Sequence, residues 1–199
     1  MKKQFTQVYQ FKITLKESKP PVWRIIQVPE TYTFYDLHVA IQDAMGWSDS
    51  HLHQFEMKDP SSGEEVEIGI PDEDFADESE TLPGWKHKIA DYFSLKNPKA
   101  EYIYDFGDNW EHLVQLEKIL PREEKLSYPI CIDGKRACPP DDCGGVWGYM
   151  DLLKTISNPD DEEYEDMMEW LGGEFDPEHF DPEDVHFENP DERRKFVLG

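Results

Sequence analysis

Positively charged residues are few in this chain. It has 20 lysines and arginines against 44 aspartates and glutamates, so its formal net charge is -24 at pH 7. Residues 59–80 and 155–192 contain no lysine or arginine. Such a chain repels phosphate backbones and anionic lipids. We therefore expect no direct binding to nucleic acid or membrane, two solvated acidic stretches, and a protein partner of basic character.

Cysteines and long apolar runs are also scarce. The three cysteines, Cys131, Cys138 and Cys143, are an odd number that cannot all pair in disulfides. The chain has no Asn-x-Ser/Thr acceptor, and no apolar stretch of the length that a signal peptide or a membrane span requires. These absences favour a reduced, cytoplasmic location.

The hydrophobic content is sufficient for a folded core. Hydrophobic residues make up 38% of the 199 residues and aromatic residues 13%, while 32% are charged. This composition is typical of one globular domain with a heavily solvated exterior. We expect a single domain over residues 1–199, with a core in 8–120, a loop region in 121–148, and a helix pair with an acidic tail in 149–199.

Alternation of apolar and polar residues predicts the strands. Six segments have this pattern: residues 8–16, 22–28, 51–57, 64–70, 100–106 and 110–120. Between the second and third segments, Thr33 and Asp36 form a capping-box pattern before a run of helical periodicity that ends at Gly46. A hairpin followed by a packed helix is the opening of a β-grasp-like fold.

The remaining apolar residues predict short helices. One lies at residues 85–93, and a pair follows at 149–156 and 164–171. The dense prolines and glycines of 121–148 predict a structured loop without regular elements, and the tail at 175–183 is expected to be extended and held by its phenylalanines. The predicted fold is α+β: a mixed β-grasp-like sheet packed against helices, with the C-terminal helix pair on the same core.

Four motifs distinguish the chain from a generic small domain. They are Trp47 with His51-Leu52-His53-Gln54-Phe55, the stretch Tyr104-Asp105-Phe106-Gly107-Asp108-Asn109-Trp110, the stretch Pro139-Pro140-Asp141-Asp142-Cys143-Gly144-Gly145, and Trp170-Leu171-Gly172 leading into Phe175-Asp176-Pro177. On these motifs the chain resembles the plasmid Ri open-reading-frame-three-like family, also labelled insertion-element passenger resolvase-like proteins. The resemblance extends over nearly the whole chain and implies an association with plasmids and insertion elements.

The turn between the last two predicted strands is a candidate metal site. A hairpin there holds Asp105, Asp108 and His112 near one another, and Asp141 and Asp142 supply two more carboxylates if the two loops meet. Hard divalent cations such as magnesium favour these oxygens. In this hypothesis His112 is a general base in metal-assisted hydrolysis. The alternative is structural, with Asp108 as a turn former and His112 as a core histidine.

The cysteines suggest a different kind of metal site. A structural zinc ion takes four ligands, which here would be Cys131, Cys138 and Cys143 with His51, His53 or His112 as the fourth. Their spacing is wider and less regular than the close cysteine pairs of zinc ribbons and knuckles. The alternative is three small thiols that are buried or half-buried.

Three functions are compatible with this sequence. The leading hypothesis is a non-catalytic, acidic protein-interaction module associated with mobile elements, because no complete nucleophile-base or metal-hydrolase set is evident. The second is the divalent-metal-dependent hydrolase, and the third is an acidic mimic of nucleic acid that inhibits a DNA-handling protein. Serine recombination is not expected, since it requires arginines and none lies between Arg24 and Arg122.

Two further expectations concern residues at the turns. Trp47 and Trp110 are predicted to be buried, because a large aromatic side chain beside a turn closes the edge of a core. Gly107 is predicted to adopt a positive φ angle in a tight hairpin. On that prediction, Gly107→Val strains the turn and abolishes metal binding.

Overall fold

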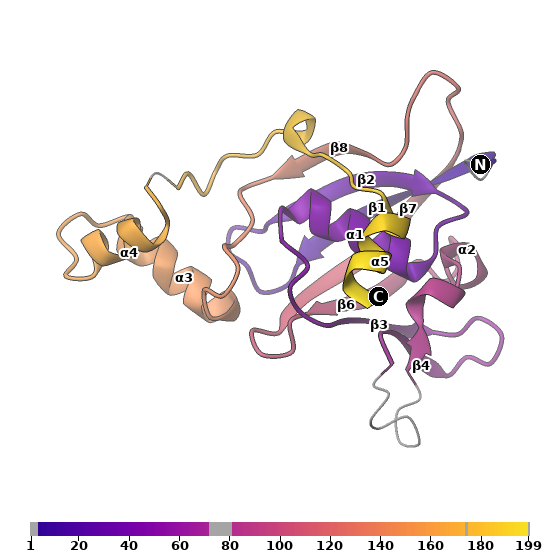
Figure 1. The fold of residues 1–199 in the computed structure, drawn as a ribbon, viewed down its shortest axis with the longest axis horizontal. Coiled ribbons are helices and arrows are strands. Elements are labelled where there is room, and N and C mark those ends of the chain that lie inside the picture. The colour runs from indigo at the N-terminus through magenta and orange to yellow at the C-terminus, as the bar shows by residue number, and fades with distance from the viewer. Residues whose placement is uncertain (1–3, 72–80, 174, 199) are drawn as a thin grey trace.

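The computed structural model describes residues 4–71, 81–173 and 175–198. In this part of the chain eight strands form one sheet: β1 Gln7–Leu15, β2 Trp23–Pro29, β3 His53–Lys58, β4 Glu65–Gly69, β5 Leu82–Pro83, β6 Lys99–Tyr104, β7 Trp110–Pro121 and β8 Ile130–Lys135. The helices are α1 Phe34–Met45, α2 Ile89–Tyr92, α3 Gly145–Ile156, α4 Tyr164–Trp170 and α5 Pro190–Leu198, with short 3-10 turns η1 Gly84–Lys86 and η2 Pro182–Asp184. The predicted α+β class is confirmed (Figure 1).

The sheet is mixed, as predicted. Its strand order is β5-β4-β3-β6-β7-β1-β2-β8, and its neighbours pair antiparallel except β4 and β5, a short parallel pair at one edge. The opening hairpin β1–β2 is present, and β1 also pairs antiparallel with the long strand β7. The β-grasp-like description is not confirmed, because the hairpin and helix here belong to a larger sheet that is mostly antiparallel.

Helix α1 lies against one face of the sheet and contributes the largest helical share of the core (Figure 1). Its capping box forms as predicted: the Thr33 hydroxyl accepts a hydrogen bond from the Asp36 N–H, and the Asp36 carboxylate accepts one from the Thr33 N–H. Gly46 ends the helix in the left-handed conformation, with φ at 90°. The inner side chains of the helix and sheet form one continuous buried cluster, which stabilises this part of the chain as a unit.

Both tryptophans beside the turns are buried, as predicted. Trp110 is 1% exposed and Trp47 is 5% exposed, and their ring centroids are 5.6 Å apart. The indole N–H of Trp47 donates a hydrogen bond of 2.9 Å to the carbonyl oxygen of Pro139. The aromatic core is therefore tied directly to the loop that precedes α3.

The C-terminal helix pair packs on the same core, mainly through α3, with Met167 of α4 partly buried against it. Tyr149 and Leu152 of α3 are buried, whereas α4 has no buried residue. The two helices project from one end of the sheet (Figure 1). In the tail, the Phe180 ring lies 3.7 Å from the guanidinium carbon of Arg24, so the expected role of a tail phenylalanine is borne out.

Two elements correct the sequence-based prediction. Strand β8 lies within residues 121–148, where no regular element was expected, and extends the sheet edge next to β2. Helix α5 follows the tail and lies in front of α1 in Figure 1. Strand β8 was missed because its six residues are too few to show a clear alternation. Helix α5 was missed because it has few apolar residues to show a helical periodicity.

Three smaller observations complete the fold. The helix predicted at residues 85–93 is divided into the 3-10 turn η1 and the single turn α2. Of the acidic stretch 59–80, residues 72–80 lie outside the described part of the chain. Within the described ranges, every helix is too short or too polar to cross a membrane.

Candidate functional site

Three of the sequence motifs meet at one end of the sheet. We call this region the loop junction and define it by residues 46–52, 105–109 and 138–145. The N–H of Gly144 donates a hydrogen bond of 3.1 Å to the Asp108 carboxylate. The two acidic loops therefore lie together, as a shared site requires.

Further hydrogen bonds attach the first segment to both acidic loops. The Ser48 hydroxyl donates to the Asp141 carboxylate at 3.0 Å. The Asp105 N–H donates to the Leu52 carbonyl at 2.9 Å. Each segment of the loop junction is thus fixed by the other two.

The loop junction brings together His51, Asp105 and Asp142, which we call the surface triad. The His51 Nε2 atom lies 3.7 Å from an Asp105 oxygen and 3.4 Å from an Asp142 oxygen. These distances exceed those of an ordinary hydrogen bond, which is about 2.7–3.2 Å for N–H···O. Ligands about 2.1 Å from a tetrahedral ion are themselves about 3.4 Å apart. The surface triad therefore has the spacing of metal ligands.

The backbone at the surface triad is unusual. Asp105 and Asp142 have φ angles of 55° and 59°, in the left-handed region that residues with a Cβ rarely adopt. The Asp105 carboxylate accepts a hydrogen bond of 2.9 Å from the Gly107 N–H, which helps to hold its conformation. Aspartate is one of the residue types that tolerate this region, so these loops can place their carboxylates at sharp turns.

The prediction for Gly107 is wrong. Its φ angle is not in the left-handed region, and Asp105 and Asn109 have the positive φ angles of this turn instead. A Cβ atom added at Gly107 would lie 3.2 Å from a carboxylate oxygen of Asp105 and near no backbone atom. The turn uses residue types that tolerate the left-handed region, aspartate and asparagine, and so leaves the glycine in ordinary backbone.

His112 does not lie with the surface triad. It is fully buried, and its ring packs against Trp47 and Tyr102 with centroid distances of 5.4 Å in both cases. Its Nδ1 atom lies 3.0 Å from the carbonyl oxygen of Trp110. Burial lowers the pKa of His112 to about 4, so the ring is neutral at physiological pH. The structure therefore favours the structural interpretation of His112.

The other predicted carboxylates serve the loops themselves. Asp108 and Asp141 accept the hydrogen bonds that join the segments of the loop junction. Of the five acidic and histidine candidates, only Asp105 and Asp142 reach a common position, and His51 joins them in place of His112. Sequence reasoning named His51 only as a partner for the cysteines.

The three cysteines do not form a ligand group with one another. In the described residues, neither of the two groups with metal-ligand spacing contains a cysteine. Burial raises the pKa of Cys131 and of Cys138, and raises that of Cys143 to about 12. The thiols are therefore protonated at neutral pH, which agrees with three small buried or half-buried side chains.

A second ligand group lies in the interior, and we call it the buried triad: His38, Asp49 and His53. The His38 Nε2 atom is 2.8 Å from an Asp49 oxygen, and the rings of His38 and His53 stack with centroids 3.4 Å apart. Sequence reasoning named only His53 and missed the other two. The available signal was a histidine on the buried face of the predicted amphipathic helix, between Leu37 and Ile41.

A groove opens beside the loop junction. It has a volume of about 350 Å³ and is lined by the 142–143 segment and by helices α3 and α4. Its lining combines acidic and apolar side chains: Asp142, Cys143, Gly148, Leu152, Glu163, Asp166, Met167 and Trp170. Asp142 therefore belongs both to the surface triad and to the groove.

The fold and this site define an α+β protein with one mixed sheet and a polar loop junction at the sheet end. The chain belongs to the family described as plasmid pRiA4b ORF-3-like protein, whose family model matches residues 7–184. The resemblance to the plasmid open-reading-frame-three-like family is thereby confirmed, whereas nothing in this match bears on the resolvase-like label.

Two relatives illustrate the family. The chain is 34% identical over 168 residues to "Uncharacterized protein y4hQ" of Sinorhizobium fredii, a match that covers 83% of this chain and 81% of the relative. It is 52% identical to a crystal structure titled as a protein of unknown function, MM3350 from Methanosarcina mazei Go1. That match has a TM-score of 0.88 and covers 92% of this chain and 100% of the other.

Proposed function

We propose that this chain is a non-catalytic, cytoplasmic protein-interaction module, and that its groove binds a partner segment that is both basic and apolar. The observation that carries the proposal is the lining of the groove. Three carboxylates, those of Asp142, Glu163 and Asp166, line it together with apolar side chains. A lining of acidic and apolar side chains complements lysine or arginine next to large apolar side chains.

Helix α4 supports this proposal because, of its apolar side chains, only Met167 packs partly buried against the core. None of its residues is buried, and Trp170 is 51% exposed. Trp147, in the first turns of α3, is 79% exposed. Tryptophan and methionine are frequent at binding surfaces, where they supply a large contact area and adaptable packing. An amphipathic helix or an extended segment can use such a groove.

The net charge of -24 supports a basic partner rather than an acidic one. The family is described by a plasmid open reading frame, so we extend the mobile-element association to this chain as part of the proposal. On this view the surface triad organises the loop that forms one wall of the groove.

Binding of labelled peptides tests the proposal. An amphipathic peptide rich in lysine and leucine should bind the full chain, and a glutamate-leucine peptide of the same pattern should not. Trp170→Ala should weaken binding at least about tenfold, since a central aromatic anchor contributes 2 kcal/mol or more. Phe196→Ala is the matched control, because Phe196 is 89% exposed and does not line this groove. Equal affinity in the Trp170 variant, or no binding of the basic peptide in low salt, would refute the proposal.

A second candidate function is metal-dependent hydrolysis at the surface triad. It is favoured by one observation, the 3.4 and 3.7 Å spacing of His51 from two carboxylates of different loops. An ion held there would lower the pKa of a bound water and so generate a nucleophile at neutral pH. This version needs no general base from His112, which is buried.

Chromogenic ester and phosphodiester substrates test the second candidate. Chelator-treated protein should regain turnover with added Zn²⁺, Mn²⁺ or Mg²⁺, and His51→Ala should lose it. His179→Ala is the control, because His179 is an exposed histidine of the tail. Absence of turnover with each metal, or equal rates in wild type and His51→Ala, would eliminate the hydrolase.

A further inference from the structure

Two aspartates that face α5 are almost completely enclosed. Asp43 lies in the last turn of α1 and Asp49 in the segment after it, and their side chains are 5% and 3% exposed. Carboxylates are rarely buried unless a cation or hydrogen-bond donors accompany them. Burial raises the pKa of Asp43 to about 6, because enclosure disfavours the charged form. A cation beside these two aspartates is therefore favoured.

Arg193 of α5 supplies this cation. Its Nη2 atom lies 3.7 Å from an Asp43 oxygen, and its Nη1 atom lies 3.5 Å from an Asp49 oxygen. The Nη1 atom is also 3.4 Å from the carbonyl oxygen of Ser48. We call the carboxylates of Asp43 and Asp49 with the Ser48 carbonyl the arginine site. The planar guanidinium, with its fork of N–H groups, matches such a set of oxygens better than a lysine ammonium does.

Arg193 occupies the arginine site at distances that are long for a charged pair. Its shortest contacts are with Glu188 of its own segment, since its Nε and Nη2 atoms both lie 2.8 Å from one Glu188 oxygen. Hydrogen bonds between a guanidinium and a carboxylate are typically about 2.7–2.9 Å long. A guanidinium that is not bonded to Glu188 can approach the two aspartates more closely than Arg193 does.

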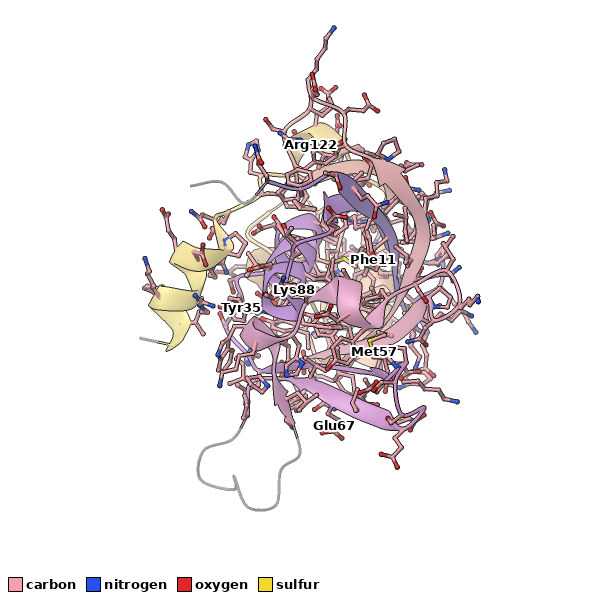
Figure 2. The ribbon with its side chains drawn as sticks, turned by 90° about the vertical axis from the view of Figure 1, so that its right-hand side faces the viewer. Phe11, Tyr35, Met57, Glu67, Lys88 and Arg122 are labelled. Carbon is pink, nitrogen blue, oxygen red and sulfur yellow. The ribbon has the colours of Figure 1, made fainter. Side chains whose placement is uncertain are left out.

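Helix α5 is attached by charged contacts rather than by apolar packing. Among its described side chains, none belongs to the buried apolar cluster or packs against it, and Phe196 is 89% exposed. A cavity of about 620 Å³ lies between α1 and α5, and its lining includes Asp43, Asp49, Arg193 and Phe196. Figure 2 shows α5 on the outer side of α1, with Tyr35 of α1 on the side that faces it. The contact between the two helices is therefore loosely packed.

The arginine site and its occupant belong to different parts of the chain. Asp43, Ser48 and Asp49 lie within residues 7–184, which the family model matches, whereas Arg193 lies beyond them. The N–H of Glu188 donates a hydrogen bond of 2.8 Å to the Asp43 carboxylate, so the segment before α5 also contacts the site. The site is thus part of the family domain, and a C-terminal segment covers it.

We propose that the arginine site binds an arginine side chain of a partner protein, and that Arg193 occupies the site when the partner is absent. The inference shares with the proposed function only the basic character of the partner, and it needs neither the groove nor the surface triad. A side chain on a nearby segment of the same chain competes at an effective concentration on the order of millimolar. Helix α5 therefore restricts the site to partners that also make contacts elsewhere on the protein.

Binding of N-acetyl-arginine amide to the full chain, followed by NMR at the Ser48 and Asp49 amides, tests this site. Arg193→Ala should bind the amide at least about tenfold more tightly than the wild type, because the competing side chain is gone. Adding Asp43→Asn to this variant should abolish the gain, since the amide side chain has no charge. Adding Asp49→Asn should have the same effect, and asparagine tolerates the φ angle of 58° at that position.

Arg194→Ala is the matched control, because Arg194 is the next residue of α5 and pairs with Asp191 instead. It should bind the arginine amide as the wild type does. The site is refuted if Arg193→Ala gains no affinity, if both double variants keep the gain, or if N-acetyl-lysine amide binds Arg193→Ala equally well. Melting temperatures of the double variants close to that of Arg193→Ala show that loss of binding is not unfolding.

A further variant separates this site from the groove. Trp170→Ala, added to Arg193→Ala, should leave binding of the arginine amide unchanged, because Trp170 lines the groove and not the cavity between α1 and α5. Failure of peptide binding in the groove would therefore not remove the arginine site, and loss of arginine binding in this variant would contradict its independence.

Discussion

Replacing Trp110 with alanine should lower the free energy of unfolding by about 3–5 kcal/mol. The side chain is 1% exposed and packs against Trp47, which itself anchors the loop before α3. Its removal deletes buried apolar surface and leaves a cavity at the end of the sheet where β7 begins. Urea denaturation monitored by circular dichroism measures the loss.

Trp147→Ala is the control for this variant. Trp147 is 79% exposed, so the same substitution there should change stability by no more than about 0.5 kcal/mol. If the two variants unfolded at the same urea concentration, the prediction would be wrong, because the buried Trp110 would contribute no more to stability than the exposed Trp147. A large fall in soluble yield of Trp110→Ala alone would agree with the prediction, because natural domains have only about 5–15 kcal/mol of stability in total.

Gly145→Ala should destabilise the protein by more than about 2 kcal/mol and should separate the segments of the loop junction. Gly145 has a φ angle of 68°, and a Cβ atom there would overlap the carbonyl oxygen of Asp108. Two penalties therefore combine, one from the left-handed backbone and one from a backbone contact that cannot yield. Separation of the segments should increase hydrogen exchange at Gly144, whose N–H now donates to Asp108.

Gly172→Ala isolates the first of these penalties. Gly172 has a φ angle of 75°, but a Cβ atom there would meet nothing within 4 Å. This variant should lose only about 1 kcal/mol, the usual magnitude of a left-handed residue with a Cβ. Equal losses for the two glycines would mean that the contact with Asp108 does not constrain the loop junction. Peptide binding in the groove should fall in Gly145→Ala, since Asp142 and Cys143 precede this glycine.

The loop junction is the feature that connects the sequence motifs to any function of this chain. Its three segments are far apart in the sequence, yet each forms hydrogen bonds with the others. The charge of the groove and the spacing of the surface triad both depend on Asp142, whose backbone is in the left-handed region. A single loop conformation therefore supports both candidate functions, and the variants described above separate them.

Elements whose signals are local could be predicted from the sequence. The capping box of Thr33 and Asp36 and the stop at Gly46 set the limits of α1, because hydrogen bonds within one turn of chain decide them. Alternation placed the strands of the two hairpins and the pair β6–β7, since one face of each strand is buried. Burial of Trp47 and Trp110 followed from the same reasoning.

Which side chains meet depends on how the whole chain packs. His112 and His51 are both histidines near a turn, but strand register directs His112 into the core and leaves His51 beside Asp105 and Asp142. His38 and Asp49 reach His53 only because α1 packs on the start of β3. The edge strand β8 and helix α5 likewise depend on partners distant in sequence. Such contacts are selected by the packing of the whole chain, and no local pattern of residues encodes them.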